Sequence, residues 1–325
     1  MRTMIPYFLF FARLCFLLPF VLYSEKTIPP EMPFPWFTGP LLAPSSNVVP
    51  LGSIDIEPYV YATNYTGNYN SHWNATSQPH FFALSWQLTL QAGLASWLDC
   101  QSTPSFTYNH TSGAAQWVVN DLPLQFDVQL LTESDEQGSL LPSIKLTLGE
   151  IFPIGTYQQL NAHKHLTDSG GSGSFTTFCG ITFGKLLYFT SAHFLNIRAN
   201  VSYQLPAPVH VKGFNSYGGG GETDGTIYPS QTLSFDGAFE YTLTRNWILA
   251  CDVVGAWSSP TRFSGELGPS ASLNSPHSSI QISIAPAIEY NWSDALGVII
   301  GPWWTLAGKN SNKFYSIVAA VNYYY

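Results

Sequence analysis

The last thirteen residues of the chain, Lys313 to Tyr325, alternate at a period of two and end on an aromatic carboxyl terminus. One face carries aromatic, aliphatic and small side chains, namely Tyr315, Ile317, Ala319, Val321, Tyr323 and Tyr325. The other face includes Ser316 and Asn322. Successive side chains of a strand point to opposite faces, so this pattern predicts a final β-strand. Such a strand can belong to a soluble sandwich, or it can cross a membrane with one face toward lipid and one toward a lumen.

The composition of the chain favours the membrane alternative. Of the 325 residues, 45% are apolar, 15% are aromatic and only 10% are charged, whereas soluble domains carry about 25% charged residues. Beyond the amino terminus, no stretch has the roughly 18 uninterrupted apolar residues that a transmembrane helix needs. A chain that is apolar overall but lacks long apolar runs fits a membrane β-barrel, because outward apolar residues there alternate with inward polar ones.

The amino terminus has the pattern of a secretory signal over residues 1–24. Arg2 precedes an apolar stretch from Ile5 to Tyr23, and Ser24 is a small residue near the expected cleavage point. Arg13 interrupts the apolar stretch, which weakens both the export signal and its alternative, a membrane anchor; of the two, the export signal is favoured. Removal of the signal leaves 10 of the 12 basic residues against 20 acidic ones, and this acidic balance argues against nucleic acid as a partner.

Residues 25–50 are rich in proline and include the run Phe34-Pro35-Trp36-Phe37-Thr38-Gly39-Pro40. Proline lacks the N–H group that a strand ladder needs, so regular strand pairing is not expected here. The segment is predicted to be a periplasmic lead-in, or a plug folded into the mouth of the barrel.

Residues 51–325 repeat the period-two pattern many times. Clear alternation covers residues 53–61, 82–91, 122–130, 197–204, 233–243 and 280–292, and weaker strands are expected near 94–108, 144–152, 175–184, 247–257 and 295–306. With the final strand these make about twelve, an even number as in closed bacterial barrels. The predicted fold is all-β: a transmembrane, up-and-down antiparallel β-barrel that ends in an aromatic residue.

The expected connections alternate in length. Short turns are expected near residues 92–95, 244–246 and 293–294, and long polar loops at 66–78, 155–173, 206–226 and 259–277. Two places are irregular: no turn is evident between Lys185 and Leu195, and Glu150 falls out of phase unless Gly149 marks a β-bulge. Aromatic residues near the expected strand ends, among them Trp97, Trp247 and Trp303, are predicted to form the two interfacial girdles.

The polar faces of these strands define a predicted lumen with an excess of acidic groups. Its candidate lining residues are Asp55, Glu57, Asp99, Asp127, Lys145, Arg198, Asp236, Glu240, Asp252 and Glu289. Carboxylates around a pore favour cations. The alternative is a structural network in which these groups bond to each other and fill a narrow barrel.

No motif of the sequence indicates a cofactor, a metal site or a catalytic centre. Ser191 and His193 are close in sequence, as a hydrolase would require, but they share one strand face near an inner turn. His163 and His165 lack a third ligand at a useful spacing. Cys100, Cys179 and Cys251 lie too far apart for a disulfide framework or a zinc site. We therefore expect a protein that is not an enzyme.

Several stretches resemble a known family of Gram-negative bacterial outer-membrane proteins. The final strand is similar to the terminal strands of outer-membrane barrels in general. Residues 37–44 (Phe-Thr-Gly-Pro-Leu-Leu-Ala-Pro), 208–215 with 223–225, and 283–291 resemble motifs of the transporter-like proteins of the meta-pathway of phenol degradation type. The resemblance covers residues 37–325 and implies a barrel of roughly twelve strands in the outer membrane. It implies little about cargo and brings no catalytic residues.

Three functions remain open from the sequence. The first is a passive channel or transporter for small solutes, which could be aromatic or apolar. The second is a plugged structural barrel whose surface loops bind host or partner molecules, and the third and weakest is an outer-membrane enzyme. In each case the expected partners are the lipid bilayer and the outer-membrane assembly machinery, which would recognise the strand from Lys313 to Tyr325.

Overall fold

The computed structural model describes residues 35–134, 140–188, 193–268 and 271–325. The predicted signal segment, residues 1–24, lies outside the described residues. The strands are β1 (Ile54–Tyr69), β2 (Ala75–Ala95), β3 (Leu98–Ser102), β4 (Ser105–Thr111), β5 (Ala114–Val119), β6 (Leu122–Leu131), β7 (Ser143–Phe152), β8 (Thr176–Tyr188), β9 (Phe194–Pro206), β10 (Val209–Lys212), β11 (Asp224–Tyr228), β12 (Thr232–Thr242), β13 (Trp247–Ser258), β14 (Arg262–Glu266), β15 (Ser279–Asn291), β16 (Leu296–Lys309) and β17 (Ser311–Tyr324). One short 3-10 turn, η2 (Ala162–Lys164), lies between β7 and β8.

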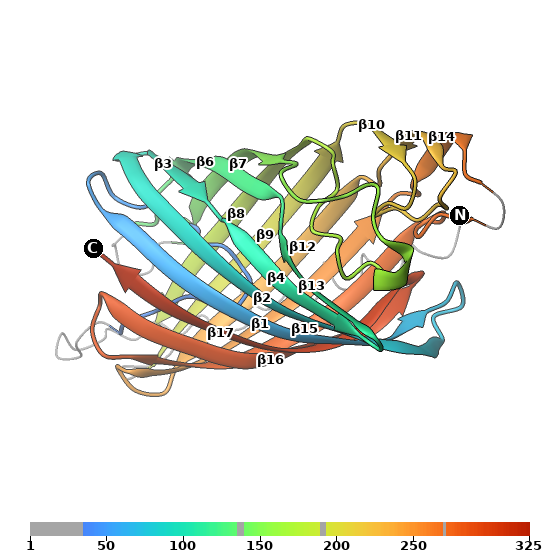
Figure 1. Cartoon of the computed structure of the whole chain (residues 1–325). Coiled ribbons are helices and arrows are strands. Elements are labelled where there is room, and N and C mark those ends of the chain that lie inside the picture. Colours follow the sequence, from blue (N-terminus) through green and yellow to red (C-terminus); the bar gives the residue numbers. More distant parts are fainter. Residues whose placement is uncertain (1–34, 135–139, 189–192, 269–270) are drawn as a thin grey trace.

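The described strands form a closed antiparallel barrel with twelve wall strands, so the predicted fold is confirmed (Figure 1). Two wall strands are interrupted: β3 continues into β4, and β5 continues into β6. The barrel closes because β1 pairs with β17 on one side and with β2 on the other. At the closing seam, Ile54 and Tyr325 exchange backbone hydrogen bonds of 2.7 and 2.8 Å. Closure pairs the first and last strands of the wall, and this matters in lipid, where an unpaired N–H or C=O group costs several kcal/mol.

The final strand shows why this sequence forms a membrane barrel. Tyr315, Ile317, Val321 and Tyr323 are 38–45% exposed on the outer face. The alternate residues Phe314, Ser316, Val318 and Ala320 are at most 7% exposed, because they face the filled interior. The predicted alternation of faces therefore holds in β17. Among the described residues, no helix has the length and hydropathy needed to cross a bilayer.

The two ends of the barrel differ in their connections. At one end, the short-turn end, residues 96–97, 243–246 and 292–295 join neighbouring strands, and β1 begins beside the carboxyl terminus. At the other end, the loop end, lie the connections 70–74, 153–175, 207–231 and 259–278. Long loops face outward and short turns face the periplasm in outer-membrane barrels.

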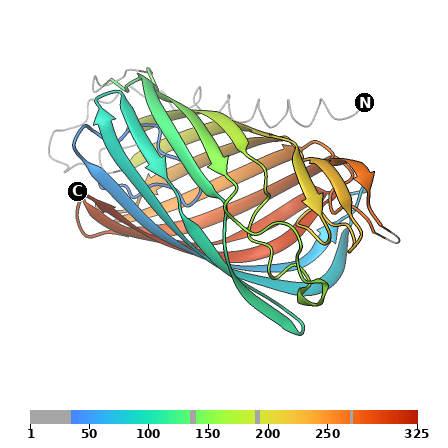
Figure 2. The ribbon, with the colours of Figure 1, turned by 45° about the horizontal axis from the view of Figure 1, so that its top comes forward.

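Three expectations about the strands were wrong. The predicted loop 66–78 is mostly strand, since β1 runs to Tyr69 and β2 starts at Ala75. The expected single strand 94–108 is broken between β3 and β4 at Pro104, which has no N–H group to donate. Strand β5 was not predicted, and its hairpin with β4 projects past the neighbouring strands (Figure 2).

The suggested bulge at Gly149 is also wrong. The pairing of β7 with β8 runs without interruption through Gly149, and the register shift between β6 and β7 lies at Gln129 and Leu131 instead. Glu150 therefore faces outward near the loop end of β7, where the Thr177 hydroxyl donates to its carboxylate at 2.7 Å. The turn missing between Lys185 and Leu195 includes residues 189–192, which lie outside the described residues.

The long loops form a folded cap. β10, β11 and β14 make a separate three-stranded sheet (Figure 1), and its buried residues Val209, Val211 and Ile227 pack with Tyr217. Burial raises the pKa of Tyr217 to about 12, so its hydroxyl stays protonated and donates to the Ser172 carbonyl oxygen at 2.8 Å. The cap thus joins loop 153–175 to loop 207–231.

Loop 153–175 is fastened at its base by Asp121, at the break between β5 and β6. The Asp121 carboxylate accepts hydrogen bonds from the Gly155 N–H (2.9 Å) and from the Ser172 N–H and hydroxyl (2.7 and 2.9 Å). Its two oxygens therefore tie together both ends of the loop.

A charge on the outer face of β17 tests the membrane orientation. We expect Ile317→Arg, near the middle of the strand, to lower the free energy of unfolding by about 2–4 kcal/mol, and Tyr323→Arg, near the strand end, by about 0–1 kcal/mol, because the cost depends on membrane depth. Urea unfolding in lipid vesicles measures both. Equal losses at the two positions would contradict this placement.

Candidate functional site

The ten predicted lumen residues all lie on the interior faces of their strands. Asp99, Asp127, Glu240, Asp252 and Glu289 are fully buried, Lys145 is 1% exposed, Asp236 is 8% exposed, and Asp55, Glu57 and Arg198 are half-buried. Burial of this many ionisable groups requires partners. Many of those partners come from the segment of residues 35–53, which we call the N-terminal segment.

The N-terminal segment runs inside the barrel rather than beside it. Its first limb begins at the short-turn end, where the Trp36 N–H donates to the Arg245 carbonyl oxygen and the Arg245 guanidinium lies 4.0 Å from the Trp36 ring. Further in, the Thr38 N–H donates to Glu289 at 3.0 Å and the Thr38 hydroxyl donates to Asn291 at 2.6 Å. Both acceptors belong to β15.

Asp252 on β13 holds the innermost part of the segment. Its Oδ2 accepts the Leu41 N–H at 3.1 Å, and its Oδ1 accepts the N–H groups of Leu42 (3.3 Å) and Ala43 (2.9 Å). A segment containing Pro40 and Pro44 cannot pair regularly with a strand. One carboxylate therefore satisfies three consecutive backbone donors that a ladder would otherwise have bonded.

A patch of small residues on the lumen wall receives the Leu41 side chain. Leu41 is 1% exposed and packs with Ala250, Ala285 and Ala287, together with Ile299, Val318 and Ala320. Alanines at these positions leave room for one leucine side chain. This contact adds apolar burial of roughly 1.5–3 kcal/mol to the hydrogen bonds of Asp252.

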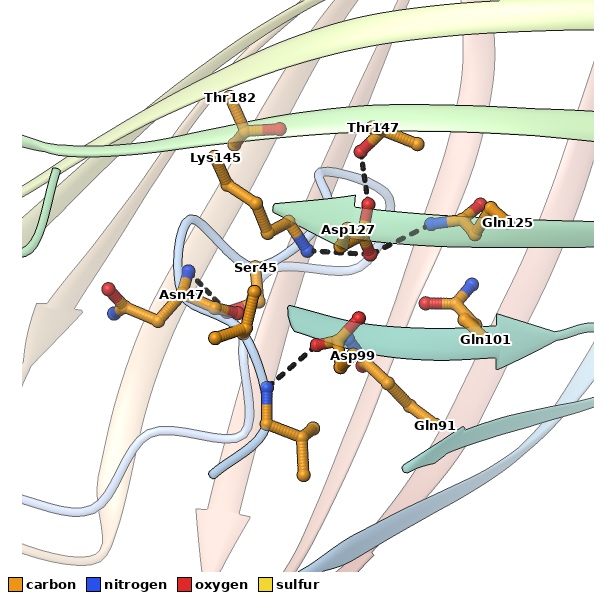
Figure 3. A network of polar contacts seen from close by, with 12 residues as sticks. Ser45, Asn47, Gln91, Asp99, Gln101, Gln125, Asp127, Lys145, Thr147 and Thr182 are labelled. Carbon is orange, nitrogen blue, oxygen red and sulfur yellow. Dashed lines mark hydrogen bonds and ion pairs between the residues drawn. The ribbon is translucent and has the colours of Figure 1, made fainter. Parts of the chain in front are cut away.

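The second limb returns along the opposite wall, as Figure 3 shows for its contacts with β3 and β6. The Val48 N–H donates to Gln129 at 2.8 Å and the Val49 N–H donates to Asp99 at 2.7 Å. The Ser143 hydroxyl donates to the Asn47 side chain at 2.7 Å. Because β13 and β15 lie across the barrel from β3, β6 and β7, the segment crosses the lumen.

Asp127 and Lys145 form a buried ion pair next to the second limb (Figure 3). The Lys145 Nζ lies 3.1 Å from Asp127 Oδ2, and both side chains are at most 2% exposed. The Thr147 hydroxyl and the Gln125 amide donate to the same carboxylate. This pair meets the requirement that a buried ion pair has further hydrogen bonds.

Arg198 lies under the first limb of the segment. Its guanidinium is 3.1 Å from the Glu240 carboxylate, which also accepts the Asn196 amide at 2.7 Å. Gly39 passes directly over this guanidinium with a φ of +108°, and a Cβ atom there would lie 3.2 Å from Arg198 Nη1. Glycine is required here by both the backbone conformation and the close approach.

Asp55 and Glu57 share one donor at the closing seam. The Asn322 amide of β17 donates to Asp55 at 2.9 Å and to Glu57 at 2.8 Å, and the Tyr59 hydroxyl donates to Glu57 at 3.3 Å. The seam between the first and last strands is therefore cross-linked inside the lumen as well as along the backbone.

The lumen keeps an acidic excess after these contacts. Oxygens of Asp99, Asp236, Glu240 and Glu289 are buried without a hydrogen-bond partner among the described residues. Eight of the ten predicted residues are acidic and two, Lys145 and Arg198, are basic. Acidic groups therefore outnumber basic ones among the predicted lumen residues.

Two cavities lie along the barrel axis beyond the N-terminal segment. One, of about 370 Å³, lies in the middle of the barrel and is lined by Leu42, Tyr61, Thr63, Ser85, Gln87, Ser105, Asn120 and Trp303. The other, of about 510 Å³, lies at the loop end and is mainly polar; its lining includes Asn68, Tyr69, Ser258, His277, Gln281 and Asn312. We call them the central cavity and the outer vestibule.

The sequence did not locate Trp303 correctly. It was assigned to an interfacial girdle, but its ring faces the lumen, where Nε1 donates to Ser283 at 3.0 Å and the ring packs edge-on against Phe314. The sequence also gave no signal for Gln129 and Asn291 as partners of the N-terminal segment, because those contacts depend on where the segment runs.

The other reactive residues are placed as follows. His193 Nδ1 lies 2.7 Å from the Thr242 carbonyl oxygen and the ring stacks on Tyr241, while Ser191 is outside the described residues. No group of three or more metal-ligating side chains occurs in the described part of the chain. Cys100, Cys179 and Cys251 are free thiols there.

No family model and no curated protein matches the sequence. The structure is similar to that of an outer-membrane channel from Pseudomonas putida F1, with a TM-score of 0.66 and 12% identity over 87% of this chain and 100% of that one. Weaker likenesses are to the translocator domain of the autotransporter NalP from Neisseria meningitidis (TM-score 0.43, 10% identity, 83% of this chain and 87% of that one) and to the NanC porin (TM-score 0.42, 10% identity, 82% of this chain and 98% of that one).

The chain has the fold of a bacterial outer-membrane β-barrel. The likeness and the closed barrel with its apolar outer face agree on this, and so the predicted location in the outer membrane is confirmed. At 12% identity the likeness establishes the fold alone. The resemblance to the transporter-like family stays a prediction.

Removal of the Asp252 charge tests its hold on the N-terminal segment. We expect Asp252→Asn to weaken the three backbone hydrogen bonds by about 2 kcal/mol in total, because bonds to a charged acceptor are the stronger ones. Hydrogen–deuterium exchange of the Leu41, Leu42 and Ala43 amides should then be roughly thirtyfold faster. Asp236→Asn is the matched control, since this buried carboxylate makes no hydrogen bond with the segment. Equal protection in both variants would contradict the role of Asp252.

The buried ion pair can be tested by stability. Lys145→Met leaves Asp127 buried without its cation. We therefore expect this variant to lower the free energy of unfolding by about 3–5 kcal/mol. The double variant Lys145→Met/Asp127→Leu should recover most of this loss. Lys185→Met is the control, because its pair with Glu133 is partly exposed and should contribute about 1 kcal/mol or less. Urea unfolding in vesicles distinguishes these values; a Lys145→Met loss no larger than that of Lys185→Met would refute the argument.

Proposed function

We propose that this protein is a passive outer-membrane channel for small solutes and that residues 35–50 act as its plug. One observation carries the proposal: between residues 38 and 49 the N-terminal segment crosses the lumen and is bonded to the wall by side chains, and backbone contacts with the wall occur near its two ends, at Trp36 and at residues 51–53. A segment held in this way can leave without breaking any strand of the wall. The outer vestibule and the central cavity lie on the path from the loop end to the plug.

The charges of the lumen support a preference for cations and neutral solutes over anions. Asp252 and Glu289 lose their backbone donors when the plug leaves, and their carboxylates then face the pore. Carboxylates that line a pore favour cations. We propose the ten predicted residues as the lining of this path, with Asp252 as the main holding point of the plug.

We also propose the solute class, the family and the assembly partner that the sequence predicts. The solutes are small and include aromatic or apolar molecules, and the chain is a member of the transporter-like group that its motifs resemble. Its last strand is the element recognised by the outer-membrane assembly machinery. The protein is not an enzyme, which fits the engagement of His193 with a backbone carbonyl group.

The folded cap supports a second candidate function, the binding of a partner molecule. Loops 153–175, 207–231 and 259–278 interlock into a folded cap rather than remaining separate, and the Asn274 N–H donates to the Tyr217 carbonyl oxygen at 2.9 Å. A fixed outer surface of this kind suits the binding of a partner molecule. It would be the main function if the lumen never conducts.

Conductance across a planar bilayer tests the channel. We expect the folded wild-type protein to open rarely and Asp252→Asn to conduct for much longer periods, because the plug is held less firmly. Under a tenfold KCl gradient the reversal potential should have the sign of a cation-selective pore. Heat-modifiable gel migration confirms folding beforehand.

Asp236→Asn provides the control for this measurement. It should keep the rare openings of the wild type, because Asp236 does not hold the plug. If the folded Asp252→Asn variant does not conduct, the channel function is rejected and the partner-binding function is favoured.

A further inference from the structure

The central cavity differs from the rest of the lumen in its chemistry. Apart from the phenol of Tyr61, its lining carries no ionisable group, although the wall below it is strongly acidic. The Asp252 carboxylate, which bonds the backbone of the lining residue Leu42, already accepts three backbone hydrogen bonds from the plug. The cavity is therefore a neutral compartment within an acidic barrel.

Two flat side chains are held in fixed positions at this cavity. Trp303 is oriented by its hydrogen bond to Ser283 and by edge-on packing against Phe314. Tyr61 is stacked on Tyr59, with the ring centroids 5.8 Å apart. Rigid aromatic faces bind flat apolar groups with little loss of conformational entropy.

Hydrogen-bonding capacity also remains at the cavity. Ser85, Ser105 and Asn120 belong to one network with Thr107. In contrast, the Gln87 amide and the Tyr61 hydroxyl make no hydrogen bond with any other residue that the structure describes. One donor and acceptor pair is thus left for a bound molecule, in addition to the aromatic faces.

The plug itself contributes one side of the cavity. Leu42 is a lining residue, and its backbone is fixed by Asp252 at 3.3 Å. The cavity is therefore complete only while the plug is in place. The space of about 370 Å³ is ample for one ring, since a cavity of roughly 150 Å³ holds benzene.

We propose that the central cavity is a binding site for a small uncharged molecule with one flat apolar ring and one hydroxyl group, and that the plug supplies part of this site through Leu42. The inference rests on the proposed channel function and deepens it. The plug is then more than an obstruction: it holds the solute between Leu42, Tyr61 and Trp303 before passage. Loss of the plug removes the site at the same time as it opens the pore.

Equilibrium dialysis with the full chain in lipid nanodiscs tests this site, with empty nanodiscs subtracted. Three radiolabelled probes share one ring: benzyl alcohol, toluene and benzoate. We expect benzyl alcohol to bind, toluene to bind roughly fivefold more weakly because it lacks the hydrogen bond, and benzoate not to bind because of its charge. This comparison needs only the wild-type protein, so no folding defect can obscure it.

Two pairs of variants locate the site. Gln87→Leu should weaken benzyl alcohol binding roughly fivefold and leave toluene binding unchanged, whereas Gln281→Leu, in the outer vestibule, should change neither. Leu42→Ala should weaken both neutral probes, whereas Val48→Ala, on the other limb of the plug, should not. Benzyl alcohol and toluene binding equally, or losses that are the same in test and control variants, would overturn the proposal.

The binding test of the central cavity and the conductance test of the channel can fail independently of each other. Conductance of Asp252→Asn without benzyl alcohol binding to the wild type would reject the site and keep the channel. Binding by the wild type, with no conductance from any variant, would keep the site and reject the channel.

Discussion

Every backbone donor inside a membrane barrel needs an acceptor, and this constraint explains most of the present structure. The wall strands satisfy it by pairing around a closed ring. The N-terminal segment cannot do so, because Pro40 and Pro44 interrupt any ladder. Its N–H groups are bonded instead by carboxylate and amide side chains from the wall, above all by Asp252. The acidic lumen is thus a set of acceptors as well as a source of charge.

The same arrangement accounts for the small number of cations in the lumen. A backbone N–H group can stabilise a carboxylate without bringing a second charge into a narrow space. Lys145 and Arg198 are found where the carboxylates of Asp127 and Glu240 lack such donors. Removing the segment therefore alters the electrostatics of the lumen without altering its net side-chain charge.

Sequence periodicity predicted the fold and the interior faces well because a strand has only two faces. Asp236, Glu240 and Asp252 could be placed in the lumen from their neighbours alone. Trp303 could not, since an aromatic residue at a strand position suits either lipid or lumen. The partners of the segment were also beyond prediction: Leu41 and Asp252 are separated by 211 positions, and their contact depends on the register of the whole ring. The β10–β11–β14 sheet was missed because its strands are short and lie within polar loops.

That large separation in sequence has a consequence for folding. Contacts between residues far apart in the chain form late, since loop closure must come first. The acceptors for residues 38–43 lie on β13 and β15, so they are in position only when most of the ring has formed. The segment can be held only by a wall in which these strands are already paired, whereas the wall strands pair with one another without the segment. In the proposed channel, the free-energy difference between the held and the released segment would set both the filling of the lumen and the fraction of time for which the pore is open.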